Sequence, residues 1–146
     1  MAETLLRPQV QIESPFGAPT REGIITNVAY ALIAMHDSLW RGEAPFASHL
    51  LYTQMFNDND ADERRIGIEA GLVIAKHAQV TALYEDLGIS TGMRMGMEHA
   101  EKVGRPIDHR RLYDASCSLV EIQEQIRANS PLPFETIAAV YARIHA

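Results

Sequence analysis

The chain of 146 residues contains a single cysteine, Cys117, and no hydrophobic run approaching the roughly 18 residues that cross a membrane. One cysteine excludes an intrachain disulfide and a cluster of cysteine metal ligands. Basic residues are also few, because 13 Lys and Arg stand against 19 Asp and Glu, for a net charge of −6. This balance argues against a broad basic face for extended nucleic acid. Residues 1–8 lack the pattern of a secretory signal. We therefore expect a cytoplasmic protein that binds neither membranes nor extended nucleic acid.

The composition suits one globular domain, since 47% of the residues are apolar and 22% are charged. Short apolar or alternating runs at 10–14, 45–51 and 80–84, and a last one beginning at Ile107, indicate strands. Apolar residues at a spacing of three to four indicate helices over 20–41 and 61–77 and a third helix that Ser90 or Thr91 would cap. Asp60 and Glu63 form the pattern of a capping box. Strands that alternate with helices predict βαβ units and a parallel sheet.

The last part of the chain, residues 113–146, differs because it has no strand pattern. Asp114 is expected to cap a helix carrying Leu119, Ile122 and Ile126, and a final helix would carry Ile137, Tyr141 and Ile144 after the interruption at 130–133. We interpret this part as a helical extension of the α/β domain formed by residues 1–112. It either packs back on the sheet or joins subunits.

Ligands of parallel α/β sheets bind at the carboxyl ends of the strands. Glu13 ends the first strand, where an unpaired buried carboxylate has a raised pKa suited to acid–base work, although a structural carboxylate is an equal alternative. His49 either binds ligand or holds its own loop, and Asp86 either holds a ribose hydroxyl or closes a turn. The loop at 84–92 leads into a helix N-terminus with Ser90 and Gly92, which suits a phosphate or carboxylate or is a plain helix cap.

Metal sites are not indicated. His36 and His99 have no partners at ligand spacing, and the acidic run at 57–60 lacks the glycine and final glutamate of a calcium loop. Met93, Met95 and Met97 are more typical of packing than of a cofactor site. We expect no metal and no cofactor.

The order of Ser14-Pro15-Phe16, Asn27, residues 42–54 and residues 86–93 resembles small phage and bacterial proteins of unassigned function in the nucleoside deoxyribosyltransferase-like superfamily. The resemblance covers residues 9–112. It implies a small Rossmann-like (flavodoxin-like) parallel sheet flanked by helices, homo-oligomers, and a nucleoside or nucleotide as the small-molecule partner. It also implies a pocket whose ligand-binding residues are Ser14, Pro15, Phe16, Asn27, His49, Ser90, Gly92 and Met93.

The sequence departs at three positions from the transferases of this superfamily. Their first strand begins with a tyrosine where this chain has Gln11 or Ile12, and the position of their nucleophilic glutamate is occupied by Gly96. Glu13, in turn, stands where those enzymes carry a small neutral residue. A carboxylate at Glu13 would permit hydrolysis by water without a covalent intermediate.

Three functions remain open at this point. The first is a nucleoside- or nucleotide-binding protein that lacks the usual glutamate nucleophile. The second is an N-glycoside hydrolase or transferase acting on a (deoxy)nucleoside or its monophosphate, with Glu13 and Asp86 as the candidate catalytic residues. The third is a structural or interaction module built on the C-terminal helices.

Overall fold

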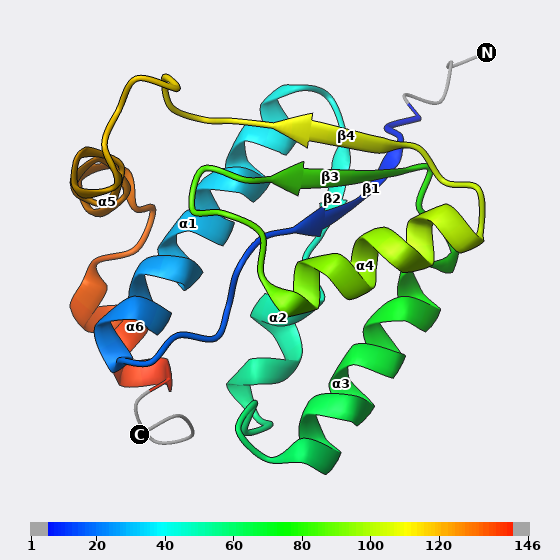
Figure 1. Ribbon diagram of the computed structural model, residues 1–146, viewed down its shortest axis with the longest axis horizontal. Helices are drawn as coiled ribbons and strands as arrows, with labels where there is room; N and C mark the ends of the chain where they lie inside the picture. The colour runs from blue at the N-terminus through cyan, green and yellow to red at the C-terminus, as the bar shows by residue number, and fades with distance from the viewer. Residues whose placement is uncertain (1–5, 142–146) are drawn as a thin grey trace.

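The computed structural model describes residues 6–141, which fold around a parallel sheet of four strands (Figure 1). The strands are β1 (Gln9–Glu13), β2 (Ala44–Phe46), β3 (Val80–Tyr84) and β4 (Ile107–Arg110), and their order across the sheet is β2-β1-β3-β4. Every pair is parallel, and Glu13 of β1 is in register with Leu83 of β3. This is a small Rossmann-like, flavodoxin-like α/β fold, in which the strand order reverses between β1 and β3.

Six α-helices flank the sheet. They are α1 (Arg21–Trp40), α2 (Ser48–Leu51), α3 (Ala61–Ile74), α4 (Thr91–Lys102), α5 (Leu119–Asn129) and α6 (Phe134–Tyr141), with short 3₁₀ turns at Tyr52–Gln54 and Ala75–His77. None of the helices within residues 6–141 is long and apolar enough to span a bilayer.

The two faces of β1 differ in chemistry because side chains alternate along a strand. Val10 and Ile12 are buried and join an apolar cluster with α1. Gln11 and Glu13 point to the opposite face, which α3 and α4 cover (Figure 1). The α1 side of the sheet is therefore the apolar core, whereas the α4 side carries polar groups.

The C-terminal helices α5 and α6 pack back onto α1, so the tail forms part of this molecule's core (Figure 1). Ile126 and Ile137 are fully buried there. Tyr141 of α6 reaches the loop after β1, where its ring centroid lies 5.9 Å from that of Phe16. The tail thus supports the loop that follows the central strand.

Several predicted details are wrong. The run at 45–51 is a three-residue strand followed by a helical turn. Asp60 caps α3, but Glu63 accepts a hydrogen bond from the amide of Asn57, so the capping box is absent. Ser118 caps α5, while Asp114 accepts from Ser116 in the turn before it. Ile144 and residues 1–5 lie outside the described residues.

Candidate functional site

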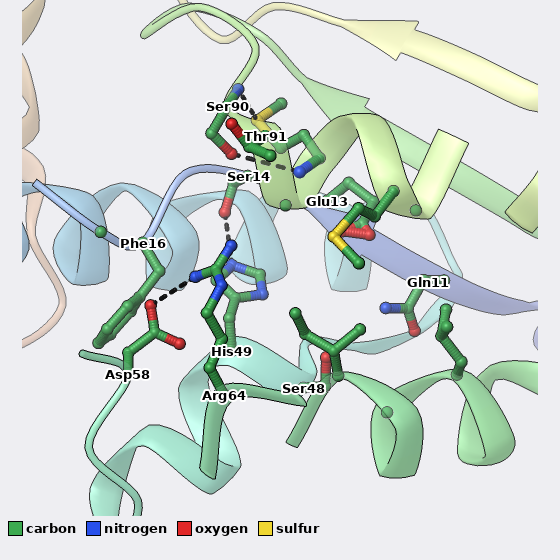
Figure 2. Close-up of a pocket in the computed structure, with 18 residues that line it drawn as sticks. Gln11, Glu13, Ser14, Phe16, Ser48, His49, Asp58, Arg64, Ser90 and Thr91 are labelled. Atoms are coloured by element: carbon green, nitrogen blue, oxygen red, sulfur yellow. Dashed lines mark hydrogen bonds and ion pairs between the residues drawn. The ribbon is translucent and has the colours of Figure 1, made fainter. Parts of the chain in front are cut away.

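A cavity of about 250 Å³ opens at the carboxyl ends of β1 and β3, between α3 and α4 (Figure 2). It lies at the point where the strand order reverses, which is where α/β sheets of this kind bind ligands. Its walls come from β1 and the loop after it, from α2, from α3 with the loop before it, and from the first turns of α4. The lining residues are Gln11, Glu13, Ser14, Phe16, Gly17, Ser48, His49, Asp58, Arg64, Ile68, Gly71, Leu72, Ser90, Thr91, Gly92, Met93, Met95 and Gly96.

Glu13 forms the floor of the cavity at the end of β1 (Figure 2). Burial raises the pKa of its carboxyl group to about 8, and neither a hydrogen bond from the Gln11 side chain nor the charge of Arg105 offsets this. The carboxyl group lies directly against Gly96 of α4, because a β-carbon at that position would collide with its oxygen atoms. Glycine at position 96 therefore makes room for the acid.

Ser14 and His49 form a hydrogen-bonded pair beside Glu13, with 2.7 Å between Ser14 Oγ and His49 Nε2 (Figure 2). Burial lowers the pKa of His49 to about 4, so the ring is neutral at physiological pH. Ser14 itself is buried. The pair adds two neutral polar groups that can exchange donor and acceptor roles with a ligand.

Arg64 of α3 supplies the positive charge of the cavity. Its Nη1 donates to Asp58 Oδ2 at 2.8 Å, and this contact fixes the guanidinium (Figure 2). A β-carbon at Gly92 would lie 3.8 Å from Arg64 Nη2, so the guanidinium faces the first turn of α4. In that turn the Ser90 amide donates to Met93 Sδ and the Met93 amide donates to Ser90 Oγ, whereas the amides of Thr91 and Gly92 have no acceptor within the helix. Positive charge and free amides are thus brought together.

A family model matches residues 8–110, and its description is a domain of unknown function, DUF7768. The chain belongs to this family. The matched region contains all four strands and every residue that lines the cavity, whereas α5 and α6 lie beyond it. No curated protein matches the chain.

Most of the predicted site residues meet in this cavity. Those that line it are Glu13, Ser14, Phe16, His49, Ser90, Gly92 and Met93. Pro15, Asn27 and Asp86 do not line it. Asn27 of α1 instead supports the loop after β1, because its Nδ2 donates to the carbonyl oxygen of Phe16 at 2.8 Å.

Asp86 holds together the loops that follow β3 and β4. Its Oδ1 accepts from the Leu112 amide at 2.6 Å and from the Tyr113 amide at 3.3 Å. Burial raises the pKa of its carboxyl group, while these amides counteract the shift. These contacts join Asp86 to the loop after β4, whereas the turn before Gly88 is closed by the Gly88 amide, which donates to the Glu85 carbonyl oxygen.

The sequence reasoning missed the cavity roles of Gln11 and Asp58. The alternation of side chains along a strand could have predicted the place of Gln11, since it lies two residues before Glu13 and therefore on the same face of β1. Asp58 had no signal of its own, because its role depends on contact with Arg64. Within residues 6–141, no group of three or more His, Cys, Asp or Glu side chains is placed to hold a metal ion.

Proposed function

We propose that the cavity binds a nucleoside or nucleoside monophosphate. The observation that carries this proposal is the arrangement of the cavity at the β1–β3 reversal, with the Glu13 acid on its floor and Arg64 beside the first turn of α4. Neutral polar groups suit the sugar and base, and the cationic turn suits a phosphate. The superfamily resemblance of residues 9–112 supports the same ligand class.

The phosphate part of this proposal is tested through Arg64. Titration calorimetry with nucleosides and their 5′-monophosphates should give tighter binding of the monophosphates. Arg64→Met should lower monophosphate affinity about tenfold or more, since charge-assisted hydrogen bonds are lost, and should leave nucleoside affinity nearly unchanged. Arg65→Met is the matched control, because Arg65 is exposed and pairs with Glu69 outside the cavity. Equal effects of the two substitutions would place the phosphate elsewhere.

A second candidate function is hydrolysis of the N-glycosidic bond. The observation that favours it is the Glu13 carboxyl group packed against Gly96, the position of the nucleophile in the transferases that the chain resembles. In this reaction water attacks the anomeric carbon, the bond to the base breaks, and the base leaves with a proton. With a pKa of about 8, Glu13 is mainly protonated at neutral pH and suits donation of that proton to the base.

Chromatography for free base, after incubation with nucleosides and deoxynucleoside monophosphates, tests this activity. We expect release of base from one substrate and its loss in Glu13→Gln. The rate should fall as pH rises through about 8 if Glu13 donates a proton, and should rise there if Glu13 accepts one from water. Full activity of Glu13→Gln would exclude the role of Glu13, and absence of free base from every substrate would leave binding as the function.

A further inference from the structure

Gln11 is a buried polar side chain on the floor of the cavity with one atom unsatisfied (Figure 2). The residue is only 4% exposed, and its Oε1 has no hydrogen-bond partner among the described residues. Buried amide oxygens are nearly always paired, because leaving one unpaired costs the whole of its lost hydration. An unpaired acceptor beside a cavity is therefore a place for a donor that enters the cavity.

The Gln11 side chain also acts on Glu13, which lies two residues along the same face of β1. Its amide lowers the pKa of the Glu13 carboxyl group, although burial raises that pKa overall. An amide lowers the pKa of an acid by donating from its nitrogen, so Oε1 is the end of the side chain that does not serve Glu13.

From the unpaired Oε1 in the cavity floor and the place of the amide next to Glu13 we propose that Gln11 determines specificity in the cavity: its nitrogen orients Glu13, and its Oε1 accepts a hydrogen bond from a neutral O–H or N–H donor of the ligand. This inference rests on the proposed function. In a nucleoside or nucleotide, such donors are the sugar hydroxyls and the amino or ring N–H groups of the base.

The expected consequence is discrimination between ligands that differ in a single donor. A ligand without the donor leaves Oε1 unpaired in the complex. Sites that hydrogen-bond a hydroxyl or amino group of their ligand reject analogues lacking that group strongly. We expect at least about tenfold weaker binding of the analogue. A site that recognises the ligand through shape alone would bind both members equally.

Calorimetry on the intact chain with two pairs of probes tests the inference and separates the two sources of the donor. Adenosine monophosphate against its 2′-deoxy form tests the sugar hydroxyl, and adenosine monophosphate against purine riboside monophosphate tests the base amino group. We expect a preference of about tenfold or more in one pair. Gln11→Met should remove that preference, whereas Gln9→Met, an exposed position on the same face of β1, should keep it.

The outcomes are separable. Binding without a preference in either pair, or a preference that survives in Gln11→Met, overturns the inference and leaves the proposed function standing. If no probe binds the wild-type protein, the proposed function fails and the inference falls with it. If Gln11→Met does not fold, Gln11→Leu, which also lacks the acceptor, takes its place in the same comparison.

A second measurement tests the orienting role of the amide nitrogen. Gln11→Met removes a donor to the ionised form of Glu13, so the carboxyl titration followed by NMR should move to higher pH than in the wild type. A merely space-filling side chain at position 11 would leave this titration where it is.

Discussion

Glu13 and Gly96 form a single unit, although they come from a strand and a helix far apart in the sequence. The acid fits only because no side chain projects from position 96. Glycine normally destabilises a helix, since alanine is favoured over it by about 1 kcal/mol in a helix interior. The presence of glycine in the middle of α4 is therefore explained by the carboxyl group that it accommodates.

Substitution of Gly96 by Ala tests this dependence. We expect Gly96→Ala to lower the free energy of unfolding by about 1–3 kcal/mol, because the new β-carbon displaces the Glu13 carboxyl group. In a Glu13→Ala background the same change should be neutral or stabilising. A double-mutant cycle in urea measures the coupling. Gly67→Ala in α3 is the control, since its β-carbon would make an ordinary 3.8 Å contact with Tyr52; equal effects of Gly96→Ala in both backgrounds would contradict the coupling.

At this scale the sequence predicts residues whose position along an element is informative. Glu13 could be predicted because it ends a strand at the binding edge of a parallel sheet. The loop-anchoring contacts of Asp86 could not, because they are made by the amides of Leu112 and Tyr113, 26 and 27 residues away. The sequence does not single out Arg64, since the direction of its guanidinium is set by Asp58.

Among the elements, α4 contributes most to the cavity because both its N-terminal turn and Gly96 line it. Ser90 begins this helix by accepting a hydrogen bond from the Met93 amide at 3.3 Å. Ser118 caps α5 in the same way, because its Oγ accepts from the Glu121 amide at 3.2 Å. Unlike Ser90, Ser118 does not line the cavity. The two caps therefore form a matched pair.

Replacement of either cap by alanine should cost similar stability and differ in binding. We expect Ser90→Ala and Ser118→Ala each to lower the free energy of unfolding by about 1 kcal/mol, since each helix loses an acceptor for an amide. Only Ser90→Ala should weaken monophosphate binding, because only its helix faces Arg64. Chemical denaturation and calorimetry on both variants check this, and an equal loss of affinity would show that the first turn of α4 does not hold the phosphate.

Elements with strong local patterns were predictable, and those shaped by distant contacts were not. The strand at 80–84 was predicted at its observed bounds, because it is a short apolar run between turns. The helical turn at Ser48–Leu51 was not, since nothing local marks it. It packs against α3, where a β-carbon at Gly71 would come within 2.7 Å of Ser48 Cβ, so a contact between elements shapes this segment.

For the whole molecule, the cavity makes stability depend on pH in two opposing ways. Folding raises the pKa of Glu13 from 4.5 to about 8, so the folded state holds more protons than the unfolded chain between these values and loses stability as pH rises. Folding lowers the pKa of His49 from 6.5 to about 4, so stability rises with pH in that range. The two slopes cancel from about pH 4.5 to 6.5.

The wild-type free energy of unfolding should therefore be nearly constant between about pH 5 and 6.5 and should fall from there to about pH 8. Below this plateau the free energy of unfolding falls further as pH falls and Glu43 is protonated, because a hydrogen bond from Arg110 lowers the pKa of its carboxyl group. In Glu13→Gln the fall of about 2 kcal/mol between pH 6.5 and 8.5 should disappear. Between about pH 4.5 and 6.5 the stability of the variant should rise with pH, because the His49 slope is no longer cancelled. Urea denaturation across pH measures both curves, and parallel curves would refute the raised pKa of Glu13.

The contact between Glu13 and Gly96 also limits how this protein can evolve. Neither residue can be replaced freely on its own, since a larger side chain at 96 requires the acid at 13 to shorten or withdraw. Among homologous sequences, glutamate at position 13 should therefore occur together with glycine at position 96. Where position 96 carries a side chain, position 13 should carry a small residue.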